Sequence, residues 1–315
     1  MSGEGARGLK RRATGLLLAG LAAGLAACCA ASAVILGWRI PARPVSERET
    51  ATLTAAHASY FSPTRLTEIT GAAIEVTDTI TAGATPGYPA IAVWDVHRSV
   101  YDTTNHQQLE PMSRTVVFDR RTAELINCCG GNIDGNGLIR QDGIAGYAFP
   151  VGTGKQTYYV FDAVLDKAEP VAYSGTDTVD GILTYRFAEH VSAANAGFSP
   201  LSSTDPELYS MHRVYWVDPE TGMVLKVTEN GDLYLVHAAT GSVATHLFTA
   251  DLRTTPGTVG QLASQDVRAR DEIARVGSAR LVLFGVAGGL ALTAGCLLAL
   301  GLGRTLLRRR SPGGQ

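Results

Sequence analysis

The sequence lacks the short motifs by which most enzymes are recognised. It contains no Gly-x-Ser-x-Gly turn, no complete phosphate-binding loop and no dinucleotide-binding glycine pattern. Its histidines show no His-x-x-x-His spacing and its cysteines no Cys-x-x-Cys spacing, so a metal site has no sequence signal. We therefore predict no catalytic, cofactor-binding or metal-binding residues, and an enzyme is not the expected class.

Charge is absent from two long apolar runs, residues 14–36 and 281–303. As a helix each run would be about 34 Å long, against a bilayer hydrocarbon core of about 30 Å, so both are expected to span a membrane. Basic residues flank both runs: Lys10, Arg11 and Arg12 before the first, and Arg304, Arg308, Arg309 and Arg310 after the second. The positive-inside rule then predicts a plasma-membrane protein with cytoplasmic tails at residues 1–13 and 304–315. The residues between the two runs would lie outside the cytoplasm.

The residues between the runs are acidic. Nine of the 27 Lys and Arg flank or precede the runs, but only Glu4 of the 29 Asp and Glu does, which leaves a net charge of −10 outside. Binding to nucleic acid or electrostatic docking onto an anionic lipid surface requires clustered Lys and Arg. This composition argues against both kinds of partner.

The first run has alternative interpretations. Leu25-Ala-Ala-Cys28 matches a bacterial lipobox, in which Cys28 would be acylated after cleavage, and Ala31-Ser-Ala33 resembles an ordinary signal-peptidase site. Apolar residues nevertheless continue to Leu36, where a processed protein usually becomes polar. We favour a retained anchor.

Each run also carries a pair of small residues four positions apart. The pairs are Gly20 with Gly24 and Gly285 with Gly289. Such pairs let two helix backbones approach closely, so they predict contact between the two spans, although glycine is also simply common in membrane helices.

Between the runs, residues 38–257 read as β-rich. Short alternating or apolar segments are separated by turn residues, among them Asp119 to Thr122, Asp218 to Gly222 and the pair Asn230-Gly231. Asn-Gly is a strong signal for a two-residue hairpin, so four short strands are expected between Val214 and Phe248. The predicted fold is mainly β, one curved antiparallel sheet resembling a half-barrel between two transmembrane helices, with strands too short for a membrane β-barrel.

Residues 258–278 break the strand pattern. Apolar residues such as Val259, Leu262 and Ile273 alternate with charged ones at helical spacing, and neither Gly nor Pro interrupts residues 261–276. We predict an amphipathic helix that continues into the second span, rather than an irregular stalk.

Only two cysteines, Cys128 and Cys129, lie outside the spans. Adjacent Cα atoms are about 3.8 Å apart, closer than in most disulfides, yet Gly130 and Gly131 would accommodate the distorted turn that a bond requires. A bond between the neighbours is favoured; a bond to another chain and two free thiols are the alternatives.

Several motifs together resemble a family of actinobacterial envelope proteins named porin PorA. They include Ala92-Val-Trp-Asp95, Asn127-Cys-Cys-Gly130, Val179-Asp-Gly181 and Trp216-Val-Asp-Pro-Glu-Thr-Gly222. The resemblance covers nearly the whole chain and implies an envelope protein with two anchors and one β-rich outer domain.

The order of the Val179-Asp-Gly181 and Trp216 to Gly222 motifs is also similar to that in lipid carriers of the LolA type, whose fold is an incomplete barrel around an apolar cavity. We therefore expect the outer domain to bind or hand over a lipid or glycolipid. The alternatives are an interaction module for other envelope proteins, with a filled core, and a pore formed by oligomerised spans.

Overall fold

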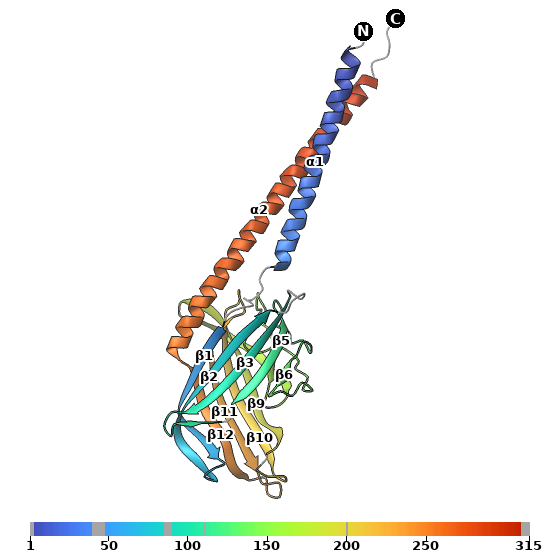
Figure 1. Cartoon of the computed structure of the whole chain (residues 1–315). Helices are drawn as coiled ribbons and strands as arrows, with labels where there is room; N and C mark the ends of the chain where they lie inside the picture. The colour runs from blue at the N-terminus through green and yellow to red at the C-terminus, as the bar shows by residue number, and fades with distance from the viewer. Residues whose placement is uncertain (1–2, 40–47, 85–89, 110, 200, 310–315) are drawn as a thin grey trace. The chain divides into compact units, whose positions relative to one another are not determined.

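The computed structural model describes residues 3–39, 48–84, 90–109, 111–199 and 201–309. These residues form two helices and twelve strands (Figure 1). The helices are α1 (Gly3–Arg39) and α2 (Pro256–Arg309). The strands are β1 (Arg48–Ser62), β2 (Thr67–Ala84), β3 (Ile91–Asp102), β4 (Gln107–Gln108), β5 (Met112–Asp119), β6 (Asn132–Ile133), β7 (Tyr158–Asp162), β8 (Lys167–Val179), β9 (Ile182–Phe198), β10 (Pro206–Val217), β11 (Val224–Val236) and β12 (Val243–Thr254).

The strands form one antiparallel sheet. Its order is β6-β5-β3-β2-β1-β12-β11-β10-β9-β8-β7, with β4 paired to β3. The first and last long strands, β1 and β12, are neighbours. Their pairing joins the strands from the first part of the domain to those from the second part in one continuous sheet. The strands curve around a common interior in Figure 1. The predicted fold class, a curved half-barrel sheet with a helix on either side in the sequence, is confirmed.

The segment between β5 and β7 links the two sides of the sheet. Leu125 forms a β-bridge with Phe118 of β5, and Glu124 forms one with Ile144. Ile144 in turn forms a parallel bridge with Val160 of β7. These short bridges satisfy backbone groups that would otherwise be unpaired at the edges of β5 and β7.

Aromatic residues fill the interior beside this closing segment. Phe149 lies 5.1 Å from Phe187 and 5.6 Å from Tyr215 between ring centroids, and Trp94 packs edge-on against Phe118 at 4.7 Å. All five side chains are almost fully buried. Edge-to-face pairs of this kind add to the stabilisation from buried area, so this end of the half-barrel is a conventional packed core.

Two expectations about the strands were wrong. The strands are long, 18 residues in β2 and 17 in β9, rather than shorter than a membrane strand. Asn230 and Gly231 lie in the middle of β11, where they pair with His212 and Met211, and three strands rather than four occupy this region. A Cβ at residue 231 would lie 2.8 Å from the Met211 side chain, so glycine makes room for an interior side chain here instead of forming a turn.

Helix α2 begins where β12 ends. The Thr255 hydroxyl accepts a hydrogen bond from the Thr258 backbone N–H, and Pro256 occupies the first helical position, so both residues suit a helix start. The first turns pack on the sheet, where Leu262 and Ala263 are buried against Trp216 of β10 and Leu225 of β11.

A buried ionic cluster attaches the same turns to the β10–β11 hairpin. Arg270 donates two hydrogen bonds of 2.7 Å to the carboxylate of Asp218 and contacts Asp266 at 3.2 Å. Burial raises the pKa of Asp266 to about 7, with the neighbouring Asp218 acting in the same direction. The pKa of Asp218 is lowered: burial works to raise it, but hydrogen bonds from Asp266 and Arg270 outweigh burial. Asp266 is therefore the member of the pair that carries the proton.

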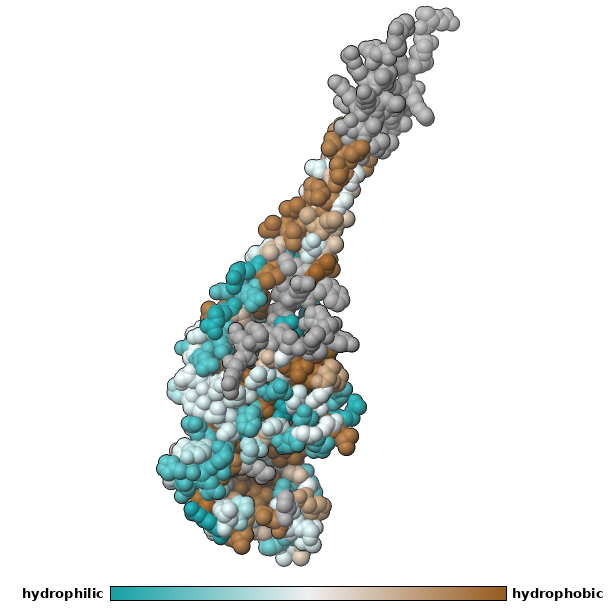
Figure 2. Space-filling model, in the orientation of Figure 1, coloured by the Kyte–Doolittle hydropathy of each residue, from teal (hydrophilic) through white to brown (hydrophobic). Residues whose placement is uncertain are grey.

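The chain divides into two compact units, Pro41–Arg270 and the remaining residues of the two helices. Both helices are long and apolar enough to cross a membrane, over Leu17–Ile35 in α1 and within Pro256–Leu300 in α2. Large apolar side chains such as Leu17, Leu281 and Leu292 are exposed on them. Figure 2 shows these stretches as predominantly hydrophobic, whereas hydrophilic residues are common on the β domain. An apolar exterior suits a lipid environment.

Among the described residues of the two apolar stretches, the small residues that are buried are alanines at seven-residue spacing. They are Ala19, Ala26 and Ala33 in α1, and Ala287 and Ala294 in α2. A Cβ placed on Gly20, Gly24, Gly285 or Gly289 would meet no atom within 4 Å. Close packing of the spans through these glycines stays a prediction.

Candidate functional site

A cavity of about 160 Å³ lies inside the half-barrel. We call it the lumen cavity. Residues of β1, β2, β3 and β5 line it on one wall, and residues of β7, β10 and β11 line it on the other. Much of its lining is apolar: Ala51, Leu53, Ile80, Met112, Val160 and Val227. The remainder includes three arginines and several acidic residues, which sequence reasoning did not anticipate.

The first of these arginines, Arg98, connects the two walls. Its Nε and Nη2 each donate a 2.8 Å hydrogen bond to the carboxylate of Asp78 on the adjacent strand. Its Nη1 lies 3.4 Å from Oε2 of Glu229 on β11. Three strands separate β3 from β11 in the sheet, so this ion pair crosses the interior.

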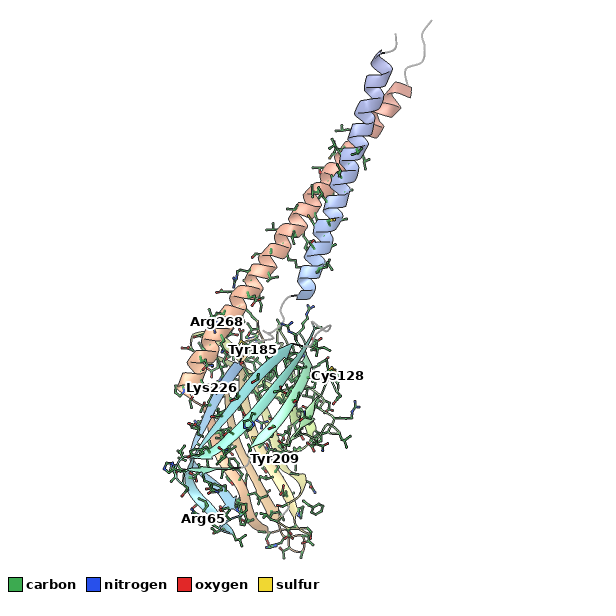
Figure 3. The ribbon with its side chains drawn as sticks, in the orientation of Figure 1. Arg65, Cys128, Tyr185, Tyr209, Lys226 and Arg268 are labelled. Atoms are coloured by element: carbon green, nitrogen blue, oxygen red, sulfur yellow. A yellow bond between two sulfur atoms is a disulfide. The ribbon has the colours of Figure 1, made fainter. Side chains whose placement is uncertain are left out.

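The second, Arg213, continues the network on the far wall. It contacts Glu229 at 3.0 Å, Glu189 at 2.7 Å and Asp162 at 3.6 Å. The hydroxyl group of Tyr209, labelled on β10 in Figure 3, donates a 3.1 Å hydrogen bond to Asp162. We refer to Asp78, Arg98, Asp162, Glu189, Arg213 and Glu229 together as the central ion network.

Burial and charge oppose each other in this network. Burial alone would raise the pKa of Glu229, but Arg98 and Arg213 outweigh it and hold that pKa below its usual range. At Glu189 burial dominates: the side chain is fully buried, and its pKa is raised to about 7 despite the contact with Arg213. Oε1 of Glu189 also has no hydrogen-bond partner among the described residues. Glu189 is therefore more easily protonated than Glu229.

The third arginine, Arg114 on β5, differs from the other two. It is 3% exposed, and no carboxylate of the described residues lies within ion-pair distance of it. Its Nε donates a 2.6 Å hydrogen bond to Oε1 of Gln141, and its guanidinium group lies 4.7 Å from the centre of the Phe161 ring. Burial lowers the pKa of Arg114, which the nearby Tyr147 and Asp162 offset only in part.

The loop that carries the two outer cysteines holds Gln141, which accepts the hydrogen bond from Arg114. The amide of Asn127 and the backbone of Gln141 exchange hydrogen bonds of 2.9 and 2.8 Å. Asn127 directly precedes Cys128 and Cys129, which are bonded to each other. Cys129 has a φ of 57° and is followed by Gly130 at 91°, so two left-handed residues complete the turn. Cys128 is labelled on this loop in Figure 3.

The residues singled out from the sequence are not brought together in the lumen cavity. Cys128 and Cys129 are bonded to each other and do not line the cavity; their loop is connected to it through Gln141, which contacts Arg114. Cys28 is a free, exposed cysteine in α1. The four helix glycines lie in the other unit.

A signal for the central ion network was present in the sequence. In a strand, residues two apart face the same side of the sheet. Asp78 lies between Val76 and Ile80, Arg98 between Val96 and Val100, and Glu189 between Phe187 and Val191. A charged residue with apolar residues at both i−2 and i+2 is therefore placed on the buried face, and this pattern could have located the site.

A model of the family named porin PorA matches residues 16–297 of this chain. The chain belongs to the porin PorA family. The match includes the apolar stretch of α1, the whole β domain with the lumen cavity, and most of α2. Together with the two helices that could cross a membrane, membership of the porin PorA family indicates an integral membrane or envelope protein. No curated protein matches this PorA-family chain.

Proposed function

We propose that this PorA-family protein is a two-pass plasma-membrane protein whose β domain lies outside the membrane and binds one end of an envelope lipid or glycolipid. The observation that carries the proposal is the lumen cavity, which lies between the two walls of the half-barrel. Its apolar lining is suited to alkyl groups, and each buried CH₂ contributes about 0.8 kcal/mol.

The size of the lumen cavity limits what it can hold. An apolar protein cavity of about 150 Å³ accommodates a molecule the size of benzene. The lumen cavity, at about 160 Å³, is comparable. It therefore suits a polar head with a few carbons or the end of an acyl chain, and the rest of a lipid would lie outside it. The lumen cavity is small and has more charged residues in its lining than the mainly apolar cavity expected from the sequence.

Conduction through the interior of the sheet is a poorer explanation of the family name. The aromatic core around Phe149 and Phe187 fills one end of the interior, and the ion pair of Arg98 with Glu229 crosses it. In addition, the outward positions of β2 that alternate with its buried residues are polar, from Glu75 through Thr77 and Thr79 to Thr81. A membrane barrel needs an apolar band on that face.

The orientation that we propose rests on charge. Basic residues flank the ends of the two apolar stretches nearest the termini, including Lys10 and Arg11 on one side and Arg304 and Arg308 on the other. The positive-inside rule therefore supports cytoplasmic termini and an extracytoplasmic β domain.

Native mass spectrometry of the full-length protein, purified from its own envelope in mild detergent, tests the binding function. We expect a lipid adduct on the wild-type protein, and its loss in Ala51→Trp, because the indole would fill the lumen cavity. Ala56→Trp is the matched control, since residue 56 is exposed on the same strand. Absence of any adduct on the wild type, or equal adducts on both variants, would reject the proposal in favour of an interaction module.

A further inference from the structure

We infer that Arg114 is the recognition residue of the lumen cavity and binds an oxyanion, a carboxylate or phosphate, at the end of the ligand. This inference rests on the binding function proposed above and names the chemistry of the ligand. It starts from the difference between Arg114 and the other arginines of the lumen cavity, Arg98 and Arg213.

Arg98 and Arg213 are each neutralised by at least two carboxylates of the described chain. Arg114 has only uncharged partners: Gln141 at Nε, the Phe161 ring against one face, and the hydroxyl group of Tyr147. Its Nη2 is buried and has no hydrogen-bond partner in the part of the chain that the structure describes. A buried N–H without an acceptor costs about 1–3 kcal/mol, and more on a charged group.

Asp162 is the carboxylate that acts against burial to raise the pKa of Arg114, but it forms no ion pair with Arg114. Asp162 accepts hydrogen bonds from the backbone N–H groups of Val164 and Leu165, and from Tyr209, and it contacts Arg213. Its oxygens are thus engaged on the far wall. No carboxylate of the described residues forms an ion pair with Arg114, so its negative partner in this inference is a molecule that enters the lumen cavity.

The surroundings of Arg114 fix its geometry before any ligand binds. Gln141 holds Nε, and Gln141 itself is held by Asn127 and by the carbonyl groups of Thr115 and Asn132. A guanidinium group presented in a fixed orientation favours planar or tetrahedral oxyanions, because two of its N–H groups can bind two oxygens at once. The apolar residues Met112, Val160 and Phe161 line the same cavity and would contact the first carbons of the ligand.

The test compares three water-soluble probes whose chain length suits a cavity of this size: hexanoate, hexyl phosphate and hexanol. Each is titrated by calorimetry into the full-length protein in lipid nanodiscs, with empty nanodiscs as the blank. We expect wild type to bind hexanoate or hexyl phosphate at least tenfold more tightly than hexanol. The relative affinities of the two anions then show whether a carboxylate or a phosphate is the better head group.

Two variants test whether Arg114 causes the preference for the anions over hexanol. Arg114→Gln should remove the preference for the anions while hexanol binding stays within about twofold of wild type. Arg140→Gln is the control, because Arg140 is an exposed arginine next to Gln141. This variant should leave the preference for the anions intact.

Equal binding of the anions and hexanol by wild type would overturn the role of Arg114 without any variant, and would leave the proposed function standing. Failure of all three probes to bind would count against the proposed function as well. A preference for anions that persists in Arg114→Gln would also reject the inference.

Discussion

Arg98 on β3 and Glu229 on β11 form an ion pair across the interior of the half-barrel, with Nη1 and Oε2 3.4 Å apart. The two residues are 131 positions apart in the sequence. Each is also bound to its own wall, Arg98 to Asp78 and Glu229 to Arg213. The pair therefore joins two separate sets of charges into one network. Its loss should weaken the ion pairs on both walls.

Glu229→Gln should destabilise the β domain strongly. Removing one partner of a buried ion pair leaves uncompensated charge and costs about 3–5 kcal/mol. Unfolding of the full-length protein in detergent by guanidinium, followed by tryptophan fluorescence, measures the loss. Asp251→Asn breaks the exposed pair with Arg253 and should give no measurable change. Equal effects of the two substitutions would contradict a structural role for the network.

Stability should decrease as the pH rises from about 5 to 8. In the folded protein Glu189 has a pKa of about 7, above its ordinary value of 4.5, so the folded state holds a proton that the unfolded state has lost. That contribution is complete below pH 4.5 and is lost as the pH passes through 7. Asp266, whose pKa is also about 7, acts in the same direction.

Glu189→Gln separates the two groups. The amide mimics the protonated carboxyl at every pH, so the melting temperature of this variant should fall less between pH 5 and 8 than that of wild type. Parallel curves for the two proteins would show that Glu189 does not titrate in this range.

The bond between Cys128 and Cys129 predicts a specific labelling pattern. In denatured, unreduced protein, alkylation should modify Cys28, Cys29 and Cys296, the cysteines that are free in the structure, and should modify the outer pair only after reduction. The three free cysteines serve as an internal control for reagent access. Peptide mass spectrometry reads the result, and labelling of Cys128 without reductant would rule the bond out.

Replacing both outer cysteines by Ser should loosen the loop that holds Gln141 behind Arg114. Disulfides contribute about 0–5 kcal/mol, so a modest decrease in melting temperature is expected. Unchanged anion preference in this variant would show that the hydrogen bonds of Asn127 hold the loop without the disulfide.

Protease added to intact spheroplasts tests the orientation. It should digest the β domain and spare tags placed at either terminus, because the flanking arginines favour cytoplasmic ends. Digestion of a C-terminal tag under these conditions would reverse the assignment for α2. Lysed spheroplasts, in which both tags are accessible, show that each tag can be cut.

Local chemistry was sufficient for much of the fold. The absence of charge over residues 14–36 and 281–303 identified the two helices that could cross a membrane. Turns were also readable where the turn residues bond among themselves. Asp119 caps the N–H groups of Arg121 and Thr122, and Asp218 accepts a hydrogen bond from Glu220. Each of these interactions spans only two or three residues.

Asn230-Gly231 shows where local chemistry misleads. The pair has the composition of a hairpin turn, but it is extended in β11 between β10 and β12. Pairing on both sides along thirteen residues of strand outweighs the turn preference of two residues. The same long-range pairing made the strands longer than the apolar segments had suggested.

The sequence by itself determined that the chain is mainly β, that it has two long apolar helices and that a curved sheet lies between them in the chain. Only the tertiary structure decided what that sheet encloses. The parity of Arg98, Arg114 and Glu229 in their strands places them on the buried face, but nothing local pairs Arg98 with Glu229 or leaves Arg114 without a carboxylate. Those outcomes depend on how the curved sheet brings distant strands together across its interior.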